Sequence, residues 1–265
     1  MPSDSGERMQ LSVGTSGFSY AEWKGPFYPA DLAGSEMLAY YAARLPAVEI
    51  NNTFYRLPRR SVLEGWAAQV PEAFRFAVKA SQRITHRKRM KDAGDETRYL
   101  LDVTQALGER LGVILFQLPP NLKLDLERFD RFLEVLPLET RAAFEFRHAS
   151  WLDPKVLERL CARSLAWVVN DDADGPPPDF LVTAPRAYLR LRRPSYTHEE
   201  LAAWAARLRA RELAEAFVFF KHEDAGAGPR LAAEFLAVAE RAERRRGPRV
   251  SGEAARAPER DREAG

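Results

Sequence analysis

Short apolar runs alternate along the chain with longer segments in which apolar residues recur every three or four positions. The runs are typical of buried strands, and the longer segments are typical of helices with one apolar face. We predict eight strands, at residues 11–17, 47–55, 74–81, 111–119, the apolar start of 141–151, 165–173, 186–193 and 215–223. We predict helices at residues 35–45, 58–69, 97–110, 125–136, 153–163, 197–211 and 229–244.

Strands and helices follow one another in strict alternation, which is the pattern of a single-domain, TIM-like (β/α)8 barrel. The helix after the sixth strand is expected to be reduced or missing, because Gly175 and three prolines at 176–178 interrupt the chain there. A doubly wound open sheet is the alternative. It is disfavoured because the first strand leads into neither a Gly-x-Gly-x-x-Gly turn nor a phosphate-binding loop. We expect residues 1–10 to be a flexible leader, 11–244 the barrel and 245–265 a disordered charged tail.

The predicted strands become polar at the same end. Glu145 and Arg147 are two positions apart in residues 141–151, so they share one side of the strand, opposite Phe144, Phe146 and His148. In a barrel of this type the carboxyl ends of all strands form one face, where the active site lies. The polar residues that the strands bring there are Glu49, Asn51, Lys79, Gln117, Glu145, Arg147, Asp171, Arg190 and Lys221.

Basic side chains outnumber acidic ones in this set, so the expected ligand is a small anion, either phosphorylated or carboxylated, or a sugar-like compound. The leading hypothesis is an enzyme in which Glu49 or Glu145 is the general acid or base. Lys79 and Arg147 would stabilise developing negative charge. The predicted substrate-binding residues are Tyr20, Trp23, Asn51, Tyr55, His86, Gln117, Trp151, Asp171, Arg190 and Lys221.

Three other interpretations of the same residues stay open. Glu49 with Lys79, and Glu145 with Arg147, would be buried ion pairs that only fill the barrel mouth. Two carboxylates also suit glycoside hydrolysis, which their separation would decide. Lys79 would be a Schiff-base former if its pKa were depressed, an effect that Arg147 promotes and Glu49 opposes.

Two alternatives change the class of function. A metal-dependent phosphodiesterase needs clustered histidine and carboxylate ligands, and the four histidines (His86, His148, His198 and His222) are scattered, so no metal or cofactor is predicted. A nucleic-acid-binding protein would use the basic residues between Arg83 and Lys91, the arginine-rich tail and aromatic side chains that stack on bases.

Composition and charge indicate the cellular compartment and the partners of the protein more clearly than its function. The net charge of +2 is too small to indicate a nucleic-acid partner by itself. Cys161 is the single cysteine, which excludes an intrachain disulfide, and its place in an apolar helical pattern predicts a buried thiol. No apolar segment resembles a signal peptide or a membrane span, so we expect a cytoplasmic protein with no membrane partner. The oligomeric state is unknown at this point.

Several motifs together resemble the YecE-like family, the domain of unknown function seventy-two. They are VGTSGFSY at 13–20, Trp23, FYP at 27–29, VEINNTFY at 48–55, FAVKA at 76–80, Thr85 with His86, LFQLPP at 115–120 and FEFRHASW at 144–151. The resemblance covers residues 11–239 and implies a barrel similar to the triose-isomerase type, without supplying a reaction. Residues 219–228 depart from the asparagine-rich segment usual in that family, so the resemblance does not extend to Lys221 and Glu223.

Overall fold

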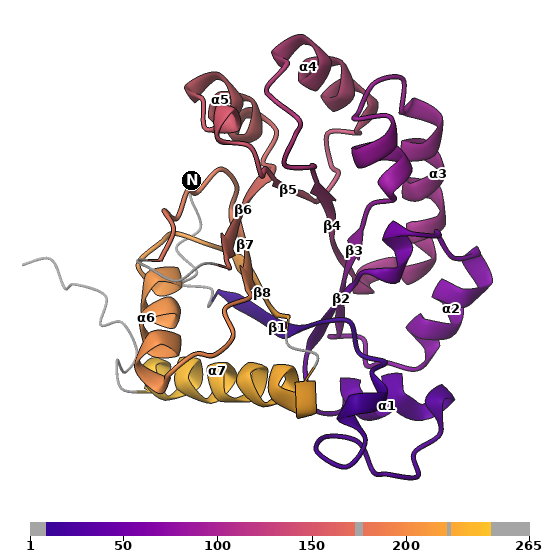
Figure 1. Ribbon diagram of the computed structural model, residues 1–265, viewed down its shortest axis with the longest axis vertical. Coiled ribbons are helices and arrows are strands. Elements are labelled where there is room, and N and C mark those ends of the chain that lie inside the picture. The colour runs from indigo at the N-terminus through magenta and orange to yellow at the C-terminus, as the bar shows by residue number, and fades with distance from the viewer. Residues whose placement is uncertain (1–8, 173–176, 222–223, 245–265) are drawn as a thin grey trace, which may run out of the picture.

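The computed structural model describes residues 9–172, 177–221 and 224–244, and in these the strands form a closed, all-parallel barrel (Figure 1). Each strand pairs with its neighbours in sequence, and the eighth closes on the first. The strands are β1 (Gln10–Ser16), β2 (Ala47–Ile50), β3 (Arg75–Lys79), β4 (Leu111–Gln117), β5 (Ala142–Glu145), β6 (Ala166–Asp171), β7 (Arg186–Leu191) and β8 (Glu215–Phe220). The predicted fold class is confirmed.

Helices surround the barrel and separate the strands in sequence (Figure 1). The α-helices are α1 (Met37–Ala42), α2 (Arg60–Ala68), α3 (Gly94–Thr104), α4 (Leu126–Val135), α5 (Pro154–Ala162), α6 (His198–Arg209) and α7 (Ala227–Arg244). Between β6 and β7, residues 177–185 contain no helix, which agrees with the predicted reduction after the sixth strand. None of the helices in the described ranges combines the length and apolar character needed to cross a membrane.

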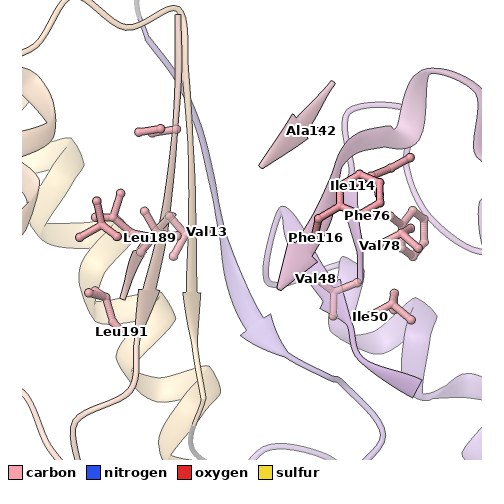
Figure 2. Close-up of a cluster of buried hydrophobic side chains, with 14 of the residues drawn as sticks. Val13, Val48, Ile50, Phe76, Val78, Ile114, Phe116, Ala142, Leu189 and Leu191 are labelled. Atoms are coloured by element: carbon pink, nitrogen blue, oxygen red, sulfur yellow. The ribbon is translucent and has the colours of Figure 1, made fainter. Parts of the chain in front are cut away.

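Two apolar layers hold the barrel together because successive strand residues point to opposite sides. Figure 2 shows part of the outer layer, in which Val48, Phe76, Leu189 and others lie between the strands and the helices. The interior is filled by a second cluster: Ala47, Ala77, Val113, Leu115, Ala143, Ala166, Val168, Ala184, Tyr188, Phe217 and Phe219. Alanines on β2, β3, β5 and β6 leave room for the aromatic side chains of β7 and β8. The barrel interior is therefore filled by side chains and is not hollow.

Gly14 allows β1 to pair closely with β2. A Cβ atom at this position would lie 1.7 Å from the carbonyl oxygen of Ala47, the residue that it faces on β2. The Tyr41 hydroxyl from α1 donates to that same carbonyl at 2.9 Å and would lie 2.8 Å from the added carbon. Only glycine fits between the strand and this hydrogen bond.

Several local predictions were less accurate than the fold class. Strand β2 ends at Ile50 rather than Tyr55, and the basic segment predicted as a loop contains a short π-helix, Arg83–Arg87. Cys161 is exposed on α5, so the prediction of a buried thiol was wrong. Residues 1–8 of the predicted leader and the predicted tail at 245–265 lie outside the described residues.

Candidate functional site

The Arg190 guanidinium crosses the barrel at the carboxyl ends of the strands and joins two acidic side chains. Its Nη2 donates to Glu49 Oε1 at 2.8 Å, and its Nη1 donates to Glu145 Oε2 at 2.6 Å. All three side chains are almost fully buried. Gln117 Oε1, at 3.4 Å, also accepts from Nη1. One arginine on β7 thus connects residues of β2, β4 and β5 across the mouth.

Besides Arg190, three hydrogen-bond donors stabilise the ionised form of Glu49. Tyr188 Oη donates to its Oε2 at 2.6 Å, and Ser16 Oγ and Asn51 Nδ2 donate to its Oε1 at 2.7 and 3.0 Å. Burial alone would raise the pKa of Glu49, but Arg190 and these three donors outweigh it and lower the pKa to about 2. Glu49 is therefore ionised at neutral pH and cannot serve there as a general acid.

Glu145, the last residue of β5, pairs with a second arginine, Arg147, which follows the strand. Arg147 Nε donates to Glu145 Oε1 at 2.8 Å, so each oxygen of this carboxylate accepts from a different guanidinium. We call Glu49, Glu145, Arg147 and Arg190 the mouth network. The ion pair expected between Glu145 and Arg147 is present, whereas Glu49 pairs with Arg190 instead of Lys79.

Lys79, at the end of β3, remains outside these ion pairs. Its Nζ lies over the Phe54 ring, 4.2 Å from the centroid, and forms no hydrogen bond or ion pair with any described residue. Burial and the positive charge of Arg190 lower the pKa of Lys79 to about 8, against the opposing effect of Glu49 and Glu145. The site therefore contains a lysine that is only partly protonated in mildly alkaline solution.

His86 packs against Phe54, the same ring that lies beneath the Lys79 amine. Its ring lies edge-on to Phe54, with centroids 4.8 Å apart, and its Nδ1 is 2.9 Å from Thr85 Oγ1. Burial, and then the charges of Lys79 and Arg147, lower the pKa of His86. A neutral imidazole thus lies beside the lysine.

Arg192 follows β7 on the same side as Arg190 and also lacks an ion pair in the described part of the chain. Its Nη1 is buried without a hydrogen-bond partner. Burial and the neighbouring Arg190 lower the pKa of Arg192, while Glu145 and the exposed Asp172 at the rim oppose this effect. Arg192 is thus a half-buried cation whose Nη1 has no hydrogen-bond acceptor among the described residues.

The mouth opens sideways between β5 and β6, where the two strands pair at only two positions, Ala143 with Ala166 and Phe144 with Trp167. A cavity of about 410 Å³ lies at the point where they separate. It is lined by Pro120, Phe146, Arg147, Trp167, Val168, Val169, Asn170, Asp172, Pro178 and Asp179. The Asn170 Oδ1 is buried without a hydrogen-bond partner, so the cavity wall carries an unused acceptor.

Some residues predicted for the site lie elsewhere. Trp23 and Trp151 are each 1% exposed: Trp23 packs among aromatic residues below the first loop, and Trp151 donates to the carbonyl of Leu122. Asp171 points toward α6, where it accepts from the Trp204 indole and from Arg193. Asn170, one residue earlier, occupies the inward position instead.

The remaining predicted residues are at or near the mouth. Tyr20 donates from its hydroxyl to the carbonyl of Ser16 at the end of β1. Tyr55 is 75% exposed and contacts Phe54, and Lys221 is exposed after β8.

The residues missed by the sequence analysis share one signal. Ser16, Asn170 and Tyr188 occupy inward positions of β1, β6 and β7, and Arg192 follows β7 two residues after the inward Arg190. Counting alternate positions from the small apolar residues of each strand would have found them. Within the described ranges, no group of three or more histidine, cysteine, aspartate or glutamate side chains is placed to hold a metal ion.

The chain was compared with known proteins. Residues 12–256 match the family described as "Protein of unknown function DUF72". UPF0759 protein YunF of Bacillus subtilis is 29% identical over 151 residues, which are 53% of this chain and 54% of YunF. UPF0759 protein YecE of Escherichia coli is 30% identical over 133 residues, 50% of this chain and 49% of YecE. The chain thus spans about half the length of these curated relatives.

Solved structures extend the match. A DUF72 family protein from Thermotoga maritima is 30% identical and superposes with a TM-score of 0.75 over 87% of this chain and 99% of its own. A DUF72 family protein from Enterococcus faecalis, at 20% identity and a TM-score of 0.73, shows the same fold. The chain belongs to the DUF72 family and is homologous to YunF and YecE, as its sequence motifs indicated.

Proposed function

We propose that the protein is an enzyme that binds a small phosphorylated or carboxylated compound at the barrel mouth. Lys79, Arg192 and the outer edge of Arg147 are the proposed anion ligands. Glu145 remains the candidate acid or base. Glu49 is reassigned to positioning Arg190, because a carboxyl group with a pKa of about 2 is a weak base.

The observation that supports this proposal is a surplus of cations without partners. Four basic side chains, Lys79, Arg147, Arg190 and Arg192, face two carboxylates whose oxygens already accept hydrogen bonds from Arg190, Arg147, Tyr188 and Ser16. Arg147 and Arg190 are paired with these carboxylates, whereas Lys79 and Arg192 are half-buried and have no ion pair among the described residues. Half-buried cations with unused N–H donors are costly to maintain unless an anion satisfies them. A phosphate or carboxylate accepts several such donors at once.

The aromatic residues favour an anion over a sugar as the main recognition element. Trp23 and Trp151, the expected stacking residues, are buried in the outer layer and present no free face. Phe146 and Trp167 line the cavity, but they pack against each other with ring centroids 4.7 Å apart, and Phe146 also stacks on Trp151.

The test is a thermal-shift and calorimetric titration with inorganic phosphate, citrate, pyruvate and sugar phosphates. An anion that binds the folded state raises the melting temperature by mass action. We expect Arg192→Gln to weaken binding about tenfold or more, the equivalent of about 1.4 kcal/mol. Arg131→Gln is the matched control, because Arg131 on the outer side of α4 is exposed and pairs only with Glu127, so the same charge is removed far from the mouth.

Absence of binding by every anion, or equal effects of the two variants, would contradict the proposal. Short oligonucleotides belong in the same titration. If they alone bind, and the Arg192 variant responds like wild type, the nucleic-acid alternative is favoured. That alternative is weakened by Glu96, whose carboxylate pairs with both Arg83 and Lys88 of the basic segment.

A further inference from the structure

We propose that Lys79 is a covalent catalyst that forms an imine with a carbonyl compound carrying a carboxylate or phosphate group. A 2-oxo acid is the simplest member of this class. This inference rests on the proposed anion site, and it adds the reacting atom and the type of chemistry. Several independent features of the structure support it.

The surroundings of the Lys79 amine differ from those of a structural lysine. Both nearby carboxylates are occupied by other groups, Glu49 by Arg190, Tyr188, Ser16 and Asn51, and Glu145 by Arg190 and Arg147. The Nζ instead lies over the apolar face of Phe54. An amine that donates no hydrogen bond to a described residue keeps its nitrogen available for attack once it loses a proton.

The charges that face Lys79 come from several elements. Arg190 on β7 and Arg147 after β5 oppose its protonation, while Glu49 on β2 and Glu145 on β5 favour it, and His86 lies beside it. Together with burial they leave the pKa of Lys79 at about 8. At pH 7 about one Lys79 amine in ten is then neutral, against fewer than about one in a thousand for an ordinary lysine.

The proposed step balances without an oxidant or reductant. The neutral Nζ attacks the carbonyl carbon, a C–N bond forms, and the carbonyl oxygen takes up one proton from the solvent. The nitrogen then gives up one of its own protons, which is passed to the hydroxyl group, so the C–O bond breaks and water leaves. The amine, the carbonyl compound and one solvent proton thus give an iminium ion, which keeps one N–H, and one water molecule. The iminium charge then lies near Glu49 and Glu145, the two carboxylates that favour a positive charge at this nitrogen.

His86 is the group that we assign to proton transfer in this step. Its neutral ring packs on the same Phe54 ring that lies beneath Lys79. The Nδ1 is close to Thr85, and the Nε2 has no partner in the described part of the chain. An imidazole in this state can accept the proton from nitrogen and return it to the leaving oxygen.

The rest of the site defines the substrate class. Arg147 and Arg192 supply donors for the carboxylate or phosphate, and the cavity between β5 and β6 receives the remainder of the molecule. The unused Asn170 Oδ1 is an acceptor there, so a substrate with a hydroxyl or N–H group beyond the carbonyl fits better than a purely apolar one.

The test traps the imine by reduction. The protein is incubated with pyruvate and sodium cyanoborohydride, and the modified lysine is identified by peptide mass spectrometry. We expect Lys79 to carry most of the label in wild type and Lys79→Met to lose it. Lys123→Met, which removes an exposed lysine, should be labelled like wild type. Peptide mapping of wild type gives the result even if a variant folds poorly.

Two further comparisons make the test specific. Acetone, a neutral carbonyl of similar size, should label Lys79 at least about tenfold less than pyruvate, since it lacks the group that the arginines bind. Arg192→Gln should reduce labelling by pyruvate and leave labelling by acetone unchanged. The rate of labelling by pyruvate should rise between about pH 7 and pH 9, a pH range well below the pKa of an ordinary lysine.

The outcomes separate this inference from the proposed function. Pyruvate that stabilises the protein without labelling Lys79 would overturn the imine and retain the anion site. Label distributed equally over exposed lysines would also overturn it. If no anion binds and no label forms, both proposals fail.

Discussion

At the scale of single residues, the mouth network makes Glu49 important for stability. Glu49→Gln keeps the shape of the side chain but leaves Arg190 with one partner fewer in a buried position. We expect the free energy of unfolding to fall by about 3 kcal/mol, measured by urea denaturation at pH 7. Glu64→Gln, in an exposed pair with Arg60, should change it by less than about 0.5 kcal/mol.

The same residue gives the stability a defined pH dependence. The pKa of Glu49 is about 2 in the fold against an ordinary value of 4.5. Its contribution is therefore complete above about pH 4.5 and is lost as the pH falls toward 2. The stability difference between wild type and Glu49→Gln should shrink over that interval, and a difference independent of pH would contradict the assignment.

Lys79, unlike Glu49, is expected to destabilise the fold at neutral pH. Its pKa of about 8 lies below the ordinary value of 10.5, so the fold disfavours the charged form, and stability from this group rises as the pH increases from 8 to 10.5. Lys79→Met should raise the free energy of unfolding at pH 7 by on the order of 1–3 kcal/mol while abolishing anion binding. The gain should decrease as the pH rises from about 8 and should vanish by about pH 10.5. A less stable variant at pH 7 would show that Lys79 supports the fold.

At the scale of elements, the contact between β1 and β2 depends on Gly14. Gly14→Ala places a methyl group against the Ala47 carbonyl, so the two strands must separate or the protein must fail to fold. We expect a loss of more than about 3 kcal/mol. Gly65→Ala is the matched control, because a Cβ on this α2 residue meets nothing within 4 Å and should stabilise the helix by about 0.5–1 kcal/mol. Both effects can be read from urea denaturation curves.

Elements were also the scale at which the sequence was most informative. Strand and helix alternation predicted the barrel because period-2 and period-3.6 patterns are local properties of the chain. The alternation placed Glu145 and Arg147 together correctly, although Arg147 follows β5 rather than belonging to it. The prediction failed at Asp171, because it chose the acidic residue and not Asn170, which alternates with the inward Ala166 and Val168, whereas Asp171 accepts from Trp204 on α6.

Partners across the barrel could not be predicted in the same way. Arg190 lies 141 residues from Glu49 in sequence. Nothing in the local sequence pattern indicates that Glu49 pairs with Arg190 and not with Lys79 on the neighbouring strand. The unused donors of Arg192 and the two-position pairing of β5 with β6 are likewise consequences of the closed barrel. The sequence therefore predicts where the mouth lies, but the structure is needed to tell which of its cations form ion pairs.

At the scale of the whole molecule, closure of the barrel predicts cooperative unfolding. Six register positions join β8 to β1, so removing any strand exposes two others. Buried tryptophans report on different sides of the molecule: Trp23, Trp151 and Trp204. We expect urea transitions followed by tryptophan fluorescence and by far-ultraviolet circular dichroism to coincide. Separate midpoints would show that part of the barrel unfolds alone.

The unequal filling of the barrel interior has an evolutionary consequence. Ala47, Ala77, Ala143 and Ala166 on one side leave the volume that Tyr188, Phe217 and Phe219 occupy on the other. If a homologue has a larger residue at one of these alanine positions, it can keep the same interior packing below its site only with a smaller residue at one of the aromatic positions opposite. Residue sizes at these positions should therefore vary in compensating pairs among relatives, although the pairs lie on strands far apart in sequence.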